Sequence, residues 1–465
     1  MDEAVDDVQS LYEKQTKIHA REVKGLFNKL RDASTGVLLG VYYLLPWLRW
    51  DERQAVLFDL PARKFYIFGL TFWPQDFVFL SWLLIIAALL LFFVTALAGR
   101  VWCGYACPQT IWTKVFVWME RLAEGRFARR IKLDRGPWTA EKILRKTTKQ
   151  LLWIGFALWT GFTFVGYFNP IQELTVSFAR LELGGWQWFW IGFYSLATYG
   201  NAGYLREQVC KYMCPYARFQ SAMFDADTLI VSYDVQRGEP RGRRQRGRDP
   251  VKLGLGDCVD CNICVQVCPT GIDIREGLQY ECITCASCID ACDEVMDKMN
   301  YPRGLIRYTT ENALEEKPSR IARPRTLVYA TLLVALCIGF FVTLANRPML
   351  HVDVIRDRNA LYRELVDGQI ENVYTLKILN KYDLAYPLTI SAEGVDGLQV
   401  DTGDREIQID AGAVLNVVAR VRAQRDTLGP GSQQIRFRVE TVDRDKVAMQ
   451  DTRFFAPIER VQDDG

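Results

Sequence analysis

Apolar residues gather in long runs rather than spreading evenly along the chain. A membrane-spanning helix needs about 20 consecutive, mainly apolar residues. Five stretches approach or meet this requirement: residues 36–50, 77–99, 151–168, 186–205 and 327–345. The first is short and contains Pro46, and for the first and the fourth a helix buried in a protein core is the alternative. The pattern predicts an α-helical transmembrane bundle of about five spans.

A different pattern begins after residue 350. Apolar and polar residues alternate in short runs, such as 373–379 and 434–439, and turn signals such as Glu393-Gly394 and Gly429-Pro430-Gly431 separate the runs. Alternation with a period of two is typical of half-buried strands. We expect residues 350–465 to form an all-β sandwich that holds together by its own core, because they contain no cysteine.

Lysine and arginine set the expected orientation. They are concentrated before the first predicted span, between the second and third, and between the fourth and fifth. Cytoplasmic loops carry this excess of positive charge. We therefore divide the chain into a cytoplasmic N-terminal segment (1–32), transmembrane helices one to four (33–205), a cytoplasmic insert (206–325), a fifth transmembrane helix (326–346) and a C-terminal domain outside the cytoplasm (350–465).

Composition narrows the possible chemistry. The formal net charge of +2 predicts no nucleic-acid partner. An arginine-rich run, residues 237–248, lies beside the lipid membrane and has no interleaved aromatic residues, so we expect a disordered linker on anionic lipid. The chain has only two histidines, His19 and His351, which excludes a bis-histidine haem in the membrane and a histidine-rich zinc or copper site. Metal chemistry must therefore use thiolates.

Eight of the thirteen cysteines form a doubled ferredoxin run. The first copy reads C-x2-C-x2-C-x3-C-P, and the second repeats the cysteine spacing but ends in Cys292-Asp293. In such runs three cysteines wrap one cubane and the fourth ligates the other cluster. We predict two 4Fe–4S clusters in an α+β dicluster ferredoxin domain over about residues 250–310, with structural zinc as the alternative. The predicted ligand sets are Cys258, Cys261, Cys264 and Cys292 for cluster 1, and Cys268, Cys282, Cys285 and Cys288 for cluster 2.

Four further cysteines form a second repeat, C-x-Y-x-C-P. The copies contain Cys103 and Cys107 after the second predicted span, and Cys210 and Cys214 after the fourth. Residues four apart share one face of a helix, so each copy can present two sulfurs together. The proline disfavours helical geometry at the second cysteine, so we expect the chain to turn there. Soft thiolates suit Cu(I), zinc, an iron–sulfur centre or a redox dithiol; the alternative is cysteine as a small apolar residue near a helix end.

The chain resembles a known family, the cytochrome c oxidase accessory proteins called CcoG, FixG or RdxA, which are membrane polyferredoxins. The residues that carry the resemblance are the stretch Asp257–Arg275, the segments Gly277–Cys282 and Met296–Tyr308, and the two C-x-x-x-C-P motifs. The resemblance implies a multi-pass protein of the bacterial inner membrane with a periplasmic, immunoglobulin-like C-terminal sandwich.

The resemblance also implies an activity. It suggests an oxidoreductase, a cupric reductase that converts Cu(II) to Cu(I) on the cytoplasmic side for assembly of a haem–copper cytochrome c oxidase. Its implied partners are copper ions, the oxidase or its assembly factors, and copper chaperones. Carried over to this chain, the catalytic, copper-binding residues would be Cys103, Cys107, Cys210 and Cys214, and the eight ferredoxin cysteines would form the electron relay.

Two other functions remain open. One is a quinol-linked electron relay, which would share the C-x-x-x-C-P motifs. The other is a non-catalytic scaffold or metallochaperone for oxidase assembly. We find neither a Rossmann glycine fingerprint nor a flavin motif in the sequence, so the electron donor would be an external protein or the quinone pool.

Overall fold

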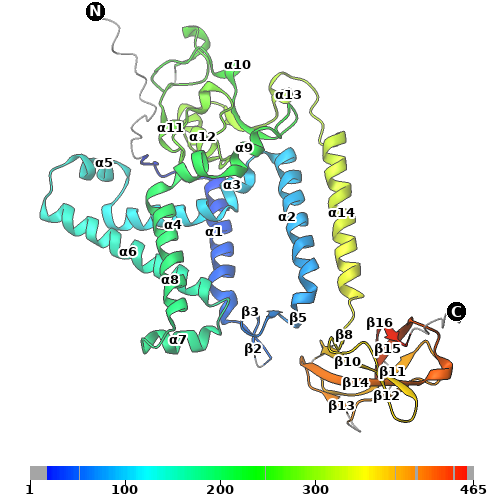
Figure 1. Ribbon diagram of the computed structural model, residues 1–465. Helices are drawn as coiled ribbons and strands as arrows, with labels where there is room; N and C mark the ends of the chain where they lie inside the picture. The colour runs from blue at the N-terminus through cyan, green and yellow to red at the C-terminus, as the bar shows by residue number, and fades with distance from the viewer. Residues whose placement is uncertain are drawn as a thin grey trace, which may run out of the picture. The chain divides into compact units, whose positions relative to one another are not determined.

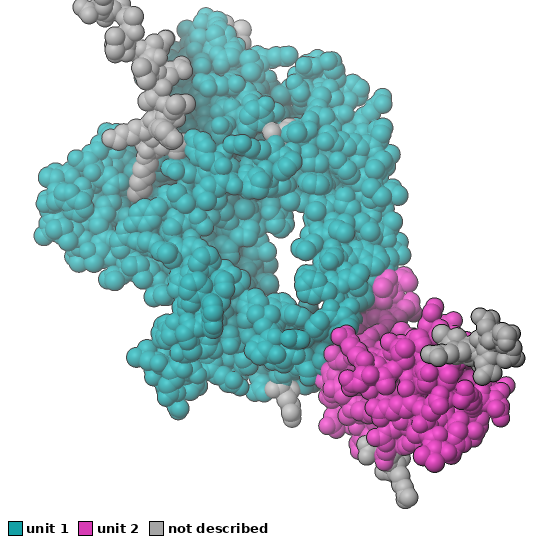
Figure 2. All heavy atoms as spheres, in the orientation of Figure 1, with its two compact units in different colours: residues 1–340 teal, residues 341–465 magenta. Residues whose placement is uncertain are grey.

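The computed structural model describes residues 18–457 except 52, 247, 383, 404–406 and 443–445. The chain forms two compact units, residues 1–340 and 341–465 (Figure 2). In the first unit, helices extend from a cysteine-rich domain to a group of short strands and α7 (Figure 1). The first seventeen residues of the predicted N-terminal segment lie outside the described residues.

Each of the five predicted spans falls on a helix. Within the described residues, two helices are long and apolar enough to cross a membrane: Pro74–Ala98, which contains α2 (Phe77–Ala98), and α14 (Pro324–Ala345). Phe79 of α2 packs edge-on against Phe340 of α14, with 5.8 Å between ring centroids. The other predicted spans fall on α1 (Leu26–Leu44), α6 (Ala140–Val165) and α8 (Gly185–Thr198), which continues as a π-helical segment over Tyr199–Leu205. For these three, a membrane crossing stays a prediction.

The helix that carries the first predicted span differs from that span in its bounds. Helix α1 begins at Leu26, within the segment assigned to the cytoplasm, and ends at Leu44. A proline inside a helix removes a hydrogen bond and clashes with the preceding turn, so at Pro46 the chain enters a short 3-10 turn (Leu45–Trp47). The early start has a tertiary cause, because the Asp290 carboxylate accepts hydrogen bonds from the first free backbone N–H groups of α1.

Several elements of the first unit were not predicted. Between α2 and α6 lie α3 (Val101–Tyr105), α4 (Pro108–Glu124) and α5 (Phe127–Arg135), and before α8 lies α7 (Ile171–Ala179). The short strands are β1 (Arg49–Trp50), paired with β2 (Arg53–Gln54), and a three-stranded sheet of β3 (Val56–Asp59), β4 (Lys64–Ile67) and β5 (Leu70–Phe72).

The cysteine-rich domain is held by a short antiparallel ribbon. Strands β6 (Ile230–Tyr233) and β7 (Ile306–Thr309) pair across the domain and bring its two ends together. The helical elements are a π-helical segment (Val209–Met213), α9 (Pro215–Ser221), α10 (Val235–Gly238), α11 (Ile263–Gln266), α12 (Ser287–Met299) and α13 (Glu311–Leu314). Ile274, Ile289 and Met296 pack with the cysteines in one apolar core.

The prediction of a disordered arginine-rich linker is wrong. Arg237 forms an ion pair with Asp257 (2.6 Å), and Arg244 donates from Nε to the hydroxyl of Tyr301 (3.0 Å). The guanidinium groups thus find acceptors on the cluster-binding loops themselves, which orders this part of the run against the domain.

The second unit confirms the predicted β-sandwich. One sheet has the order β12-β14-β10-β8 with β9 beside β10, and the other has the order β13-β11-β15-β16. Tyr374 and Phe437, one from each sheet, are fully buried with 5.2 Å between ring centroids. The strands are β8 (Leu350–Arg356), β9 (Arg363–Glu364), β10 (Gln369–Asn380), β11 (Tyr386–Glu393), β12 (Gln399–Asp401), β13 (Ile407–Ile409), β14 (Val414–Gln424), β15 (Ser432–Thr441) and β16 (Val447–Phe455).

Candidate metal and electron-transfer site

The two C-x-x-x-C-P motifs adopt similar local structures. Cys103 lies in α3 and Cys107 is the residue before α4; Cys210 lies in the π-helical segment and Cys214 is the residue before α9. Cys107 and Cys214 have extended backbones, with ψ angles of 127° and 110°. The turn predicted at the second cysteine of each motif is therefore confirmed, and its cause is the proline that follows.

The structure brings the two motifs together. The thiols of Cys107, Cys103 and Cys214 are all close enough to that of Cys210 to interact with it electrostatically. We call these residues the four-thiol group. Burial and this thiol crowding raise the pKa of Cys210 to about 12, and burial also raises the pKa of Cys103 against the opposing charge of Arg100. Without a metal, both thiols therefore keep their protons at neutral pH.

Two polar residues that the sequence did not single out support the four-thiol group. Arg100 is buried; its Nε donates to Gln220 Oε1 (2.8 Å) and its Nη1 donates to the carbonyl of Tyr280. The thiol of Cys103 donates to the same Gln220 oxygen at 3.5 Å. The amide nitrogen of Gln220 is fully buried and has no hydrogen-bond partner within the described structure. An orphaned donor is costly in a protein interior, and the Gln220 side chain also lies close enough to the Tyr216 hydroxyl to oppose the rise that burial causes in the pKa of that group.

The eight ferredoxin cysteines surround two small cavities. Cys268, Cys282, Cys285 and Cys288 line one cavity, and we call them the proximal set. Cys258, Cys261, Cys264 and Cys292 line the other and form the distal set. Cys264 also borders the proximal cavity. These groupings agree with the crossed pairing expected from the spacing, in which the fourth cysteine of each run serves the other cluster.

The walls of both cavities suit an iron–sulfur cubane. Apart from thiols they are mainly aliphatic, with Ile272 and Ile274 in the proximal cavity and Leu305 and Ile306 in the distal one. Burial raises the pKa of Cys282 to about 12, so the thiol loses its proton only in exchange for iron. Across the described residues, no three His, Cys, Asp or Glu side chains close around a single-ion position, and this holds for the four-thiol group as well as for the two cavities.

The four-thiol group lies directly against the proximal set. Cys103 packs with Ile283 and Cys285 in one buried cluster. Gly104 is so close that an added Cβ would lie 2.7 Å from the carbonyl oxygen of Ile283 and 2.9 Å from the Cα of Cys285. Arg100 interacts electrostatically with Cys103 and Cys210 on one side and with Cys282 on the other. The distal set lies farther out, where Cys261 is exposed to solvent.

Comparison with known proteins agrees with this organisation. A family model described as a 4Fe-4S dicluster domain matches residues 205–311, and one described as a 4Fe-4S binding domain matches residues 80–130. The model for the immunoglobulin-like fold at the C-terminus of FixG matches residues 340–457. The match to the 4Fe-4S binding domain over residues 80–130 includes Cys103 and Cys107 of the four-thiol group, so an iron–sulfur centre is one candidate for what this group binds.

Two relatives are similar in sequence to most of the chain, and a third is similar to about half of it. The nitrogen fixation protein FixG of Rhizobium meliloti is 41% identical over 422 residues, covering 83% of this chain and 80% of that protein. Protein RdxA of Cereibacter sphaeroides is 42% identical over 403 residues, covering 84% of this chain and 85% of that protein. The ferredoxin-type protein NapH of Haemophilus influenzae is 25% identical over 231 residues, covering 47% of this chain and 68% of that protein.

Proposed function

The chain belongs to the FixG/RdxA family of membrane iron–sulfur redox proteins, and from this premise we propose that it reduces Cu(II) to Cu(I) at the four-thiol group. In this proposal the proximal and distal sets hold two 4Fe–4S clusters. The reaction takes place on the cytoplasmic side of a bacterial inner membrane, and its product serves the assembly of a haem–copper oxidase.

The observation that carries the proposal is the packing of Cys103 and Gly104 against Ile283 and Cys285. When bound, the clusters supply single electrons. Gly104, next to Cys103, then lies against the backbone that holds the proximal ligand Cys285, so an electron would leave the ferredoxin domain beside the four-thiol group.

The thiols suit copper as the electron acceptor. Cu(II) prefers nitrogen and oxygen ligands, whereas thiolate sets favour Cu(I). A set of four thiols therefore stabilises the reduced product more than the substrate. The Arg100 guanidinium offsets the negative charge that develops when Cys103 and Cys210 lose their protons.

The positions of the three thiol groups relative to one another and to solvent suggest a direction of electron flow. The distal set includes the exposed Cys261, whereas the proximal set touches the four-thiol group. We infer that an external donor delivers electrons at the distal side and that they leave from the proximal side.

A second candidate follows from the 4Fe-4S binding model over residues 80–130 and from the likeness to NapH. The four-thiol group would then hold a further iron–sulfur centre in a quinol-linked relay. The four thiols would be cluster ligands, and copper would not be the substrate.

Metal content separates the two candidates. Anaerobically purified protein should contain about eight irons per chain in two clusters, and it should bind Cu(I) tightly after purification. Serine at Cys103 and Cys107, or at Cys210 and Cys214, should abolish tight Cu(I) binding and preserve all the iron, because a hydroxyl is a poor ligand for a soft cation. About twelve irons, falling to about eight in the serine variants, would instead establish the relay.

A further inference from the structure

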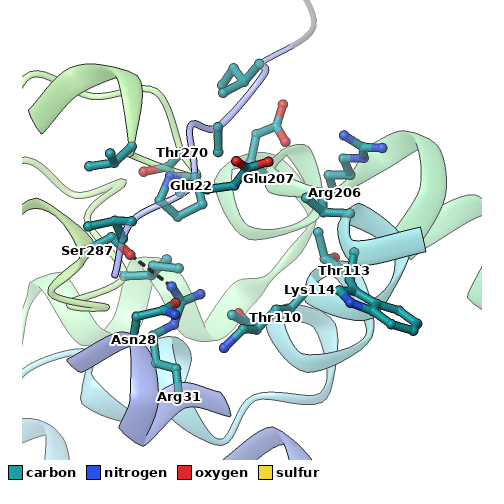
Figure 3. A pocket seen from close by; sticks show the side chains of 18 of the residues that line it. Glu22, Asn28, Arg31, Thr110, Thr113, Lys114, Arg206, Glu207, Thr270 and Ser287 are labelled. Atoms are coloured by element: carbon teal, nitrogen blue, oxygen red, sulfur yellow. Dashed lines mark hydrogen bonds between the residues drawn. The ribbon is translucent and has the colours of Figure 1, made fainter. Parts of the chain in front are cut away.

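A cavity of about 530 Å³, with charged side chains in its wall, lies beside the four-thiol group. Its walls come from the N-terminal segment, α1, α4, the chain around Arg206 and Glu207, and the loops of the ferredoxin domain, as the side chains in Figure 3 show. Cys210 lines the cavity, whereas no ferredoxin cysteine belongs to its described wall. The cavity therefore opens onto the four-thiol group, and Ser287 places it one residue from a proximal ligand.

The wall carries an excess of positive charge. Among the described residues of the wall, six cationic side chains face three carboxylates, a difference of three positive charges. The cations are Arg21, Arg31, Lys114, Arg121, Arg130 and Arg206, and the carboxylates are Glu22, Asp32 and Glu207. A concave surface of one sign concentrates ligands of the opposite sign. This cavity thus repels a free divalent cation and attracts a small anion.

Several of these cations lack a full counter-charge. The two hydrogen bonds described for Arg31 go to a backbone carbonyl (3.3 Å) and the hydroxyl of Ser287 (2.9 Å), both neutral. Arg130 and Arg206 share one carboxylate, Glu120, at 3.7 and 2.7 Å, and Arg130 shares the more distant Glu22 with Arg121. Arg130 is 1% exposed, and within the described structure its Nε has no hydrogen-bond partner. An anion in the cavity would supply the missing charge and acceptors.

We propose that this cavity receives copper as a small anionic complex, carried by a ligand with several carboxylates, and that the copper passes to the thiol of Cys210. This inference rests on the function proposed above. In the transfer the Cys210 thiol loses its proton, a copper–sulfur bond forms, and a carboxylate oxygen of the carrier leaves and takes up the proton. Copper stays Cu(II) in this step and gains one electron from the relay afterwards. A soluble electron donor would need no thiol in the wall, so the position of Cys210 favours a metal carrier.

Exchange-inert complexes test the binding step alone. The full chain, purified with its clusters oxidised, is titrated calorimetrically with the cobalt(III)–ethylenediaminetetraacetate anion and, separately, with the hexaamminecobalt(III) cation. We expect saturable binding of the anion that weakens as salt rises, and no binding of the cation. Lys114 pairs with Asp32 of the same wall at 2.6 Å, so Lys114→Gln removes a positive charge and leaves that carboxylate uncompensated; it should raise the Kd of the anion about tenfold. The matched control is Lys298→Gln, which removes the same charge from a side chain that is 68% exposed outside the cavity, and it should leave the Kd unchanged.

The outcomes separate this inference from the proposed function. Absence of anion binding, preference for the cation, or equal effects of the two lysine variants would overturn the cavity assignment, even if the serine variants of the four-thiol group lose copper binding. Specific anion binding that Lys114→Gln weakens would support the assignment, even in a chain whose serine variants bind Cu(I) normally.

Discussion

At the scale of single residues, Gly104 is the closest point of contact between the four-thiol group and the ferredoxin domain. It lies in the middle of α3 with a negative φ, so the glycine is needed for space and not for backbone freedom. An added Cβ would meet backbone atoms of Ile283 and Cys285 at 2.7 to 3.1 Å, and backbone cannot rotate away. Any side chain here must push the motif away from the proximal set.

Gly104→Ala should therefore slow electron transfer while both clusters remain. Because the rate of electron transfer falls with the distance between donor and acceptor, we expect cluster reoxidation by Cu(II) to slow measurably in stopped-flow absorbance. Gly155→Ala in α6 is the control, since a Cβ added there would meet no neighbouring group of the described residues within 4 Å. Equal rates in the two variants would show that the contact plays no part in transfer.

Arg100 is the second residue whose role can be measured. Its charge interacts with thiols on both sides of the contact. Reduction adds negative charge to a cluster, and nearby charge is one determinant of cluster potential. Arg100→Gln should make the proximal potential more negative in an EPR-monitored redox titration, whereas Arg100→Lys should restore most of it. An unchanged potential in Arg100→Gln would mean that the charge is too well screened to matter.

At the scale of elements, α12 connects the two cavities. It carries Cys288, which lines the proximal cavity, and Cys292 one turn later, which lines the distal one. Cys292→Ser should destabilise the distal cluster and Cys288→Ser the proximal cluster, as judged by iron content and by the EPR spectrum of the remaining cluster. Loss of the same cluster in both variants would contradict the crossed assignment.

Buried charges fasten α4 to the elements around it. Glu120 is fully buried, with Arg206 at 2.7 Å and Arg130 at 3.7 Å. Removing one partner of a buried ion pair costs about 3 to 5 kcal/mol because it leaves an uncompensated charge. Glu120→Ala should therefore lower the thermal midpoint markedly. Glu141→Ala should change it little, because Glu141 pairs with Arg129 and Arg145 in solvent; similar effects of both substitutions would show that Glu120 is not a structural anchor.

Apolar run length predicted the positions of the five long helices but not all of their ends. Helix α1 begins before the apolar run because tertiary contacts support residues 26–32, including the Asp290 cap and the hydrogen bond from Arg31 to Ser287. Apolar run length also missed α4, whose mixed apolar and charged surface packs against α6 and carries its charges inward. Local pattern contains no information about such distant partners.

At the scale of the whole molecule, cysteine spacing predicted the two ferredoxin sets because cubane geometry fixes the separation of ligands along the chain. The spacing of cysteines along the chain could not predict that the two C-x-x-x-C-P motifs lie close together in space. Cys103 and Cys210 come from separate helical segments, and the packing of these segments brings them near each other. Arg100 and Gln220 were missed for the same reason. Arg100 lies three residues before Cys103, which is one sequence signal for a role near this thiol, but an arginine at the end of an apolar helix is more often an anchor at the membrane surface.

The membrane topology is a prediction that depends on the distribution of charge over the whole chain. The distribution of positive charge predicts that residues 206–325 lie in the cytoplasm and 350–465 outside, and α14 is long and apolar enough to cross a membrane between them. Reporter fusions after residue 300 and after residue 457 should report opposite compartments. Fusions that report the same compartment would mean that α14 does not cross the membrane.

The most direct test of copper reduction is a single turnover. The full chain, with both clusters reduced and excess reductant removed, is mixed with Cu(II), and cluster reoxidation is recorded together with Cu(I) captured by a chromogenic chelator. We predict one Cu(I) for each electron the clusters lose. We also predict that serine at Cys103, Cys107, Cys210 and Cys214 slows both signals by at least about 100-fold, because the acceptor then has no soft ligands at the contact. Clusters that reoxidise at the wild-type rate in this variant, with the same yield of Cu(I), would contradict the account.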